Sequence, residues 1–155
     1  AHEGIPNEEG VICPIIHRDI KPSNILVVQD ASLGQLVKVL DFGIAKLRQT
    51  DSEQTNYYLG TLAYSSPEQM EGKELDSRSD IYSLGVMLFE MLTGKMPLQA
   101  ETHSFGGWYK VHHFQQPRSF ESVRPQLKLP KALENLVMNC LAKKPEERPQ
   151  TVGDI

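Results

Sequence analysis

A charged stretch that reads HRDIKPSN holds the side chains that are best suited to chemistry. It places a carboxylate at Asp19, an ammonium at Lys21 and an amide at Asn24, close together in one short loop. The apolar, β-branched runs at 15–16 and 25–28 flank this loop, and such runs are typical of buried strands. A solvated surface turn is the alternative, because most charged stretches that contain proline are turns. A turn alone does not need an acid, a base and an amide at fixed spacing, so the pattern favours a functional loop held between two strands.

The sequence after this loop predicts a small β-hairpin. Residues 25–28 and 36–40 read as two short strands joined by the turn QDASLGQ. Residues 3–10, EGIPNEEG, read instead as a loop, because glycine and proline interrupt them. The stretch 41–67 has no sustained periodicity and is rich in polar residues, and a loop of that length inside a compact domain is usually functional or disordered.

Later segments predict helices, so that the fold is expected to be mainly α with a small β component. Residues 77–93 are apolar on every face, which is typical of a helix in the middle of a domain. Ser77 and Asp80 fit a capping box at the start of this helix. After Pro130, apolar residues recur with the i, i+3, i+4, i+7 spacing of another helix, and a shorter helix is expected around 107–114.

Composition restricts the class of protein. The chain of 155 residues carries a net charge of −4, which gives no support to a nucleic-acid or membrane partner. Cys13 and Cys140 lack metal-ligand spacing and are expected to be free thiols in a reducing cytosol. No signal peptide is recognisable, and the most apolar run, 81–92, is far shorter than a membrane span. These features predict a soluble, cytoplasmic protein or a piece of one.

Ordered motifs along the chain resemble those of one family. HRDIKPSN at 17–24 resembles the catalytic loop of protein kinases, and DFG at 41–43 resembles their magnesium motif. GTLAYSSPEQ at 60–69 is similar to the end of a kinase activation segment. SDIYSLGVMLFEMLTG at 79–94 and CLAKKPEERP at 140–149 are similar to the central helix and to the closing motif. The pattern is most similar to the eukaryotic-like Ser/Thr kinases of bacteria.

The resemblance implies transfer of the γ-phosphate of Mg-ATP to Ser or Thr hydroxyls of a protein substrate. Asp19 would accept or orient the hydroxyl proton, and Lys21 would neutralise the transferred phosphate. Asn24 and Asp41 would offer oxygen ligands to Mg²⁺. Thr61 would link the substrate-binding loop to the catalytic acid and lysine, and its presence argues against tyrosine specificity. Taken singly, these residues would be ordinary turn residues and strand-end caps.

Other matched residues have regulatory or structural roles in the family. Arg18 directly precedes the catalytic aspartate, and such an arginine often pairs with a phosphate on the activation loop. Thr55 lies five residues before Gly60, where similar bacterial kinases carry a phosphorylated threonine. Asp80 either caps its helix or braces the catalytic loop. The resemblance also implies structural roles. His17 and Phe42 would be packing residues of the hydrophobic spine of the family, and Gly43 would complete the DFG turn. Glu68 and Arg148 would form a buried ion pair, and Asp80 is likewise structural.

The chain departs from the family pattern in several places. Ser66 stands where alanine is usual, Tyr82 stands where tryptophan is usual, and segment 3–15 is longer than the usual link into the catalytic loop. The GxGxxG loop and the VAIK-like lysine that hold ATP in the family do not occur. We therefore expect residues 1–155 to be the C-terminal lobe of a kinase whose N-lobe lies upstream. We also expect a last helix cut at Ile155 and no activity of the fragment alone.

Two other classes of function remain open. A pseudokinase scaffold would bind partners without chemistry, but such proteins usually lose one of Asp19, Asn24 and Asp41, and all are present. A small-molecule phosphotransferase shares an HxD…N loop but is not expected to carry the DFG and SPE segments. A metal site at His112 and His113 is disfavoured, because adjacent helical residues point apart, and a surface position is expected for them.

Overall fold

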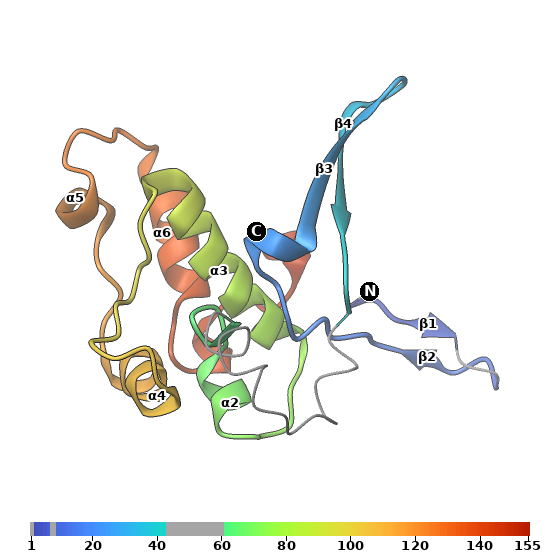
Figure 1. Cartoon of the computed structure of the whole chain (residues 1–155). Helices are drawn as coiled ribbons and strands as arrows, with labels where there is room; N and C mark the ends of the chain where they lie inside the picture. The colour runs from blue at the N-terminus through green and yellow to red at the C-terminus, as the bar shows by residue number, and fades with distance from the viewer. Residues whose placement is uncertain (1, 7–8, 43–60) are drawn as a thin grey trace.

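The computed structural model describes residues 2–6, 9–42 and 61–155, so the predictions for Gly43 and Thr55 lie outside the described residues. Within these ranges the strands form two antiparallel hairpins and the helices gather around one long helix (Figure 1). The strands are β1 (Ile5–Pro6), β2 (Ile12–Cys13), β3 (Ile25–Asp30) and β4 (Gly34–Val39). The α-helices are α2 (Pro67–Met70), α3 (Ser77–Thr93), α4 (Phe105–Phe114), α5 (Phe120–Val123) and α6 (Lys131–Cys140), and the 3-10 helices are η1 (Pro22–Asn24), η4 (Pro145–Glu147) and η5 (Val152–Asp154).

The central helix α3 begins and ends at clear caps. The Asp76 carboxylate accepts a hydrogen bond from the Arg78 N–H at 2.8 Å, and the left-handed Gly94 (φ +70°) ends the helix. The predicted cap at Ser77 is therefore wrong, because the capping residue is its neighbour Asp76. This leaves the carboxylate of Asp80, in the first turn, for a different contact.

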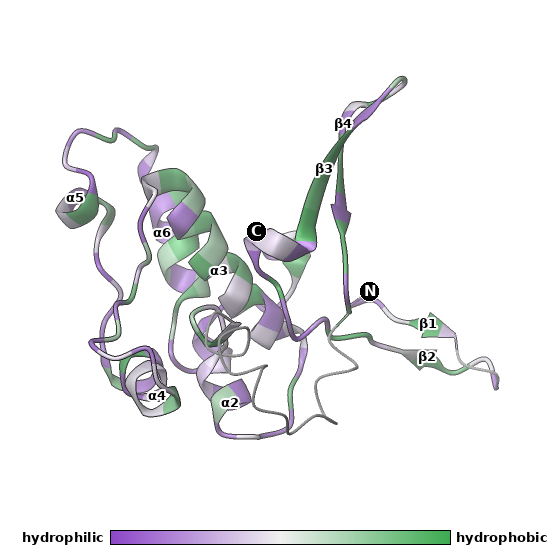
Figure 2. Cartoon of the chain, in the orientation of Figure 1, coloured by the Kyte–Doolittle hydropathy of each residue, from purple (hydrophilic) through white to green (hydrophobic). Residues whose placement is uncertain are grey.

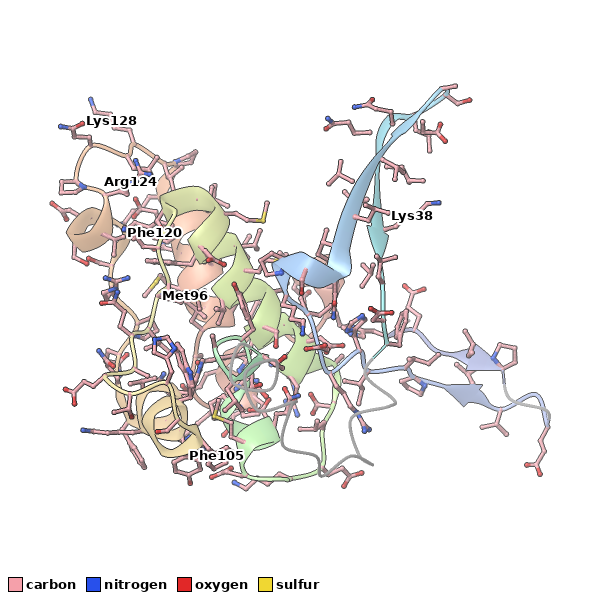
Figure 3. All side chains as sticks on the ribbon, in the orientation of Figure 1. Lys38, Met96, Phe105, Phe120, Arg124 and Lys128 are labelled. Carbon is pink, nitrogen blue, oxygen red and sulfur yellow. The ribbon has the colours of Figure 1, made fainter. Side chains whose placement is uncertain are left out.

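The main hydrophobic core lies where α3, α5 and α6 meet. Its buried side chains are Tyr82, Val86, Phe89, Phe120, Val137 and Leu141. Helices α3 and α6 approach so closely that a Cβ on Gly85 would lie 2.6 Å from Cys140 Cβ, which requires glycine at that position. Beyond α5, Arg124 Nε donates a hydrogen bond to the Thr93 carbonyl at 2.7 Å and ties this segment to the end of α3 (Figure 3). The predicted central helix is thus confirmed.

Helix α4 covers a second, smaller core. Its Trp108 and Val111 side chains pack with three buried residues from other segments. Leu62 precedes α2, Met70 is the last residue of α2, and Leu98 follows α3. The helix predicted around 107–114 is confirmed with an earlier start, because the Ser104 Oγ caps it by accepting a hydrogen bond from the Gly107 N–H at 3.1 Å.

The remaining helices divide into one that the sequence predicts and two that it does not. Helix α6 follows Pro130 as predicted. The single-turn helices α2 and α5 were not expected, and each is capped by a serine, Ser66 or Ser119. At the predicted last helix, the described chain forms the 3-10 helix η5. Among the described residues, no helix is both long and apolar enough to cross a bilayer.

The hairpin β3–β4 extends away from the helices, with Ile25 opposite Val39 and Asp30 opposite Gly34 (Figure 1). The Asp30 carboxylate accepts hydrogen bonds from two backbone N–H groups in the turn, and Gly34 (φ +76°) begins the return strand. The predicted hairpin is confirmed, although its turn is shorter than QDASLGQ. Figure 2 shows apolar residues along β3, and Lys38 points from β4 away from the helices in Figure 3.

Three expectations about strands and loops are wrong. The run 15–16 forms no strand and is half-buried, and the apolar residues of β3 are not enclosed, since Leu26 and Val27 are 44% and 55% exposed. Conversely, the predicted loop 3–10 contains β1, which pairs with β2 through Ile5 and Cys13. A two-residue strand has no alternation for a sequence pattern to reveal.

Candidate active site

The loop between β2 and β3 brings the predicted acid, lysine and amide into one buried cluster. The Asn24 amide donates hydrogen bonds to the Asp19 main-chain carbonyl at 2.8 Å and to Asp19 Oδ2 at 3.0 Å. Lys21 Nζ lies 3.1 Å from Asp19 Oδ2 and donates to Thr61 Oγ1 at 2.9 Å. All four residues are buried, with exposed fractions of 2–6%. Burial fixes these side chains in place, so the cluster is organised without a ligand.

The chain reaches Asp41 beside this cluster. The Leu40 N–H donates a hydrogen bond to the Asn24 carbonyl at 2.8 Å, which holds the end of β4 against the start of β3. Asp41 follows in the left-handed region (φ +54°) and is exposed. Because the Asn24 amide nitrogen is turned to Asp19, its oxygen remains as a possible ligand. An amide oxygen and a carboxylate fit Mg²⁺, which takes few protein ligands besides water and phosphate oxygens. No cluster of three or more His, Cys, Asp or Glu side chains suited to a metal occurs in the described part of the chain.

His17 joins the loop to the end of β4. Its Nε2–H donates to the Leu40 carbonyl at 2.9 Å, and its Nδ1 accepts from the Asp19 N–H at 3.2 Å. These two bonds define one neutral tautomer, with the proton on Nε2. The ring lies against Phe42, with 4.7 Å between ring centroids. The imidazole thus holds the backbone at two points and packs on the phenyl ring.

Asp80 holds the backbone of the same loop. Its Oδ2 accepts from the His17 N–H at 2.7 Å, and its Oδ1 accepts from the Arg18 N–H at 2.8 Å. His2 Nε2 also lies 2.8 Å from Oδ2. Of the two roles considered for Asp80, these are the contacts of a brace, since Asp76 caps the helix. A carboxylate that accepts two backbone N–H bonds from a strained loop fixes its path.

Glu68 and Arg148 form a buried bidentate ion pair, with nitrogen–oxygen distances of 2.7 and 2.9 Å. Ser79 Oγ donates to Glu68 Oε1 at 2.7 Å, and Arg148 also donates to three backbone carbonyls. Burial acts to raise the pKa of Glu68, but the hydrogen bonds and charge of Arg148 outweigh it, and the pKa lies below its usual value. The pair ties α2 to α3 and to the segment after α6.

Sequence reasoning missed further contacts of the segment 61–70. The Tyr64 hydroxyl donates to Glu90 Oε2 at 2.5 Å, and Gln69 Nε2 donates to the Arg18 carbonyl at 2.7 Å. Burial, together with the Glu90 carboxylate, raises the pKa of Tyr64. No local pattern signals these pairs, because each joins residues far apart in the chain.

The expectation of a surface position is wrong for His112. This imidazole is fully buried, and its Nδ1 lies 2.8 Å from the Tyr82 hydroxyl. Burial, followed by the nearby charges of Lys143 and His113, lowers the pKa of His112 to about 3. His113 lies on another face, 3.4 Å from Glu71 Oε1. The two imidazoles thus have partners in different parts of the fold, as expected for adjacent helical residues that point apart.

Comparison with known proteins places these features in a family. The chain is 63% identical over 156 residues to "Serine/threonine-protein kinase A" of Synechocystis sp., which covers 100% of this chain and 29% of that relative. It is 38% identical over 140 residues to "Serine/threonine-protein kinase pkn3" of Myxococcus xanthus, covering 87% of this chain and 25% of the relative. It is 40% identical over 146 residues to "Serine/threonine-protein kinase PknB" of Mycolicibacterium smegmatis, covering 91% of this chain and 22% of the relative.

The chain spans less than a third of the length of these curated relatives. The family model described as "Protein kinase domain" matches residues 12–153, which is most of the chain and includes every described residue of the buried cluster. The chain therefore belongs to the protein kinase family.

Proposed function

We propose that this chain is the C-terminal lobe of a Ser/Thr protein kinase, which together with its N-lobe transfers the γ-phosphate of ATP to Ser or Thr hydroxyls of proteins. The observation that carries the proposal is the buried cluster of Asp19, Lys21, Asn24 and Thr61. The names of the bacterial relatives, all serine/threonine-protein kinases, support the same activity. Phosphoryl transfer asks a protein mainly for positioning and charge neutralisation, and a rigid, charged cluster supplies both.

Within this proposal each residue has a distinct role. Asp19 accepts or orients the proton of the substrate hydroxyl. Lys21 carries a positive charge that lies between Asp19 and Thr61, where it neutralises the phosphoryl group during transfer. Thr61 connects this lysine to the segment 61–65, which we propose as the binding segment for the substrate residue. The buried contact between Lys21 and Thr61 supports Ser/Thr rather than tyrosine specificity.

The fit of the donor set supports Mg²⁺ as the metal of this site. Asn24 Oδ1 and the Asp41 carboxylate would hold the ion, and Mg²⁺ would neutralise charge on the ATP phosphates. The left-handed backbone of Asp41 and its exposure leave the carboxylate accessible to such a ligand. Leu40 and His17 hold the backbone on which Asp41 sits, so the site depends on this chain's own hydrogen bonds.

We propose that the other half of the ATP site comes from an N-lobe outside this chain. Exposed apolar side chains support this, because Val27 and Val37, which are paired on one face of the hairpin, are 55% and 59% exposed and Phe42 is 41% exposed. Exposed apolar side chains that are paired in this way are suited to an interface. The absence of a GxGxxG loop from the sequence also supports it. A cytoplasmic location stays a prediction, based on cysteine usage and charge.

A transfer assay with labelled ATP and Mg²⁺ tests the proposal in the full-length gene product. The substrates are a generic protein such as casein and, in parallel, an aminoglycoside. Transfer to serine or threonine of the protein, abolished by Asp19→Asn, is the expected result. Transfer only to the aminoglycoside would instead indicate a small-molecule phosphotransferase. Binding of ATP without transfer to any acceptor would indicate a pseudokinase.

A further inference from the structure

The peptide group between Arg18 and Asp19 is held on both sides by side chains. Its carbonyl accepts a hydrogen bond from Gln69 Nε2 at 2.7 Å. Its N–H donates to His17 Nδ1 at 3.2 Å. His17 is a member of the same loop, whereas Gln69 lies 51 positions along the chain. The contact from Gln69 is therefore the one that relates this peptide to another part of the fold.

This peptide follows a residue in a disfavoured conformation. Arg18 has φ +66°, in the left-handed region that residues with a Cβ avoid. Such a conformation persists only where surrounding contacts over-determine it. Asp80 holds the N–H of Arg18, and Gln69 holds its carbonyl. Together they fix both peptide planes that flank the left-handed residue, and hence the direction in which the Asp19 side chain leaves the backbone.

Gln69 is itself attached to a rigid support. It lies in α2, where its N–H donates to the capping Ser66 Oγ at 3.3 Å. Its neighbour Glu68 is locked in the buried ion pair with Arg148. A glutamine whose backbone is held in this way can define the position of a partner group more closely than one on a loop.

The segment 61–70 therefore contacts the catalytic loop at two points. Thr61 accepts from Lys21 on one side of Asp19, and Gln69 donates to Arg18 on the other side. A movement of this segment would therefore reach Arg18 and Lys21, which lie on either side of Asp19 in the loop.

We propose that Gln69 is a positioning residue for Asp19, which couples the placement of the substrate-binding segment to the orientation of the catalytic carboxylate. The inference rests on the proposed function, because it assigns Gln69 a part in phosphoryl transfer. Gln69 touches no reacting atom, and its effect is exerted through the peptide group before Asp19. Loss of its N–H donor releases the carbonyl of a strained residue and lets the carboxylate adopt other directions.

The test compares donor and non-donor side chains at position 69 in the full-length gene product. Gln69→Glu keeps the shape but presents no N–H when ionised, Gln69→Leu removes both polar atoms, and Gln69→Lys keeps a nitrogen donor of comparable reach. Gln126→Leu is the control, because Gln126 is exposed and remote from the loop. We expect kcat to fall about 10- to 100-fold for Glu and Leu, the scale of a small misplacement of a catalytic group. We expect unchanged KM for ATP and protein, an unchanged melting midpoint, and recovery of most turnover with Lys.

Two results would overturn the inference. Unchanged kcat in both Gln69→Glu and Gln69→Leu would show that the carbonyl of Arg18 needs no donor. A loss of activity that follows a lowered melting midpoint and disappears at low temperature would show a role in stability alone. Hydrogen exchange of the peptide 17–21 gives an independent readout. Faster exchange there, with α3 unchanged, is expected for Gln69→Leu, and equal exchange would count against the inference even if the wild-type protein transferred no phosphate.

Discussion

The Lys21 ammonium lies 3.1 Å from the Asp19 carboxylate, and both side chains are almost completely excluded from water. Two opposite charges at this distance in a buried site interact strongly and resist displacement. The carboxylate is further held by the Asn24 amide at 3.0 Å. The position of Asp19 is therefore set before a substrate arrives, which is the condition for efficient catalysis by an orienting group.

Asp19→Asn should reduce kcat by about 10²–10⁴-fold, the scale expected for a positioned acid–base group. The substitution retains shape but removes the negative charge beside Lys21 and the ability to accept a proton. Asp41→Asn should be at least as damaging, because the proposed magnesium ligand loses its charge. Steady-state rates with Mg-ATP and a protein substrate provide the measurement. An Asp19→Asn enzyme within a few-fold of wild type would remove Asp19 from the catalytic role.

Arg148→Met should lower the free energy of unfolding by about 3–5 kcal/mol, because it leaves the Glu68 carboxylate buried without its partner. Lys131→Met is the matched control, since its pair with Glu134 is at the surface, where solvent screening leaves such pairs with little effect on stability. Urea titration of each variant at neutral pH measures the difference. Equal losses in the two variants would contradict the importance of the buried pair.

The same pair predicts a change in pH dependence. In the wild type the pKa of Glu68 is lowered, so the stabilisation is present above the pKa of the unfolded chain and is lost as pH falls through the folded value. In Arg148→Met, burial raises the pKa of Glu68 and is opposed mainly by the smaller effect of the Ser79 hydrogen bond. Acidification to pH 4 should therefore lower the free energy of unfolding less in this variant than in wild type, or raise it. Urea titrations from pH 7 to pH 4 measure this difference, and parallel curves would contradict it.

His112 should destabilise the fold in mild acid. Its pKa is about 3 in the folded protein, whereas an unfolded histidine titrates at about 6.5, so the unfolded state binds the proton first. The free energy of unfolding therefore decreases as the pH falls below the pKa of the unfolded histidine, by up to about 1.4 kcal/mol per pH unit. His112→Gln should show a shallower decline between pH 6 and pH 5, where Glu68 does not titrate. A decline equal to that of wild type would show that the buried imidazole accepts the proton without penalty.

Substitution of two helical glycines by alanine should have opposite effects. At Gly85 the added Cβ would meet Cys140 Cβ at 2.6 Å, so Gly85→Ala should destabilise by about 1–3 kcal/mol through overpacking. At Gly106, in α4, no atom lies within 4 Å of the new Cβ, and Gly106→Ala should stabilise by up to about 1 kcal/mol through helix propensity. Thermal unfolding of the two variants measures these changes in stability. A Gly85→Ala variant that is more stable than wild type would refute the close approach of α3 and α6.

Thr55 should carry a phosphate in the active protein, a prediction that rests on sequence alone because the residue lies outside the described part of the chain. Arg18, directly before Asp19, is half-buried and provides a guanidinium for a phosphate to pair with. Thr55→Ala should therefore lower turnover, while Thr55→Glu should restore part of it. Mass spectrometry of active protein should locate phosphate between Asp41 and Thr61, and its absence there would contradict the prediction.

Motifs and periodicity predict those elements of this molecule whose structure is determined by residues close together in the sequence. The apolar surface of α3, the repeating leucines of α6 and the two apolar runs of β3–β4 are visible in short windows of sequence. The side chains of the buried cluster are recognisable because three of them occupy one short loop. Thr61 was found only through its resemblance to the family, and its contact with Lys21 spans 40 positions.

Features that arise from distant packing could not be predicted in this way. Nothing in the sequence near Gln69 or Tyr64 indicates Arg18 or Glu90 as a partner. The single turns α2 and α5 show no periodicity, and a serine cap alone is too common to identify them. The burial of His112 follows from α4 lying over the second core, which decides which face of that helix meets Tyr82.

The anchors of Asp19 have a consequence for how the chain folds. Asp80 is 62 positions from Arg18, Gln69 is 51 positions away, and Thr61 is 40 positions from Lys21. Each contact closes a long loop, and the closure entropy must be overcome before the contact stabilises anything. The native geometry of the loop that holds Asp19 should therefore be among the last features to form, after the helices have assembled. An incompletely folded chain would then lack the aligned carboxylate, even where its helices are already in place.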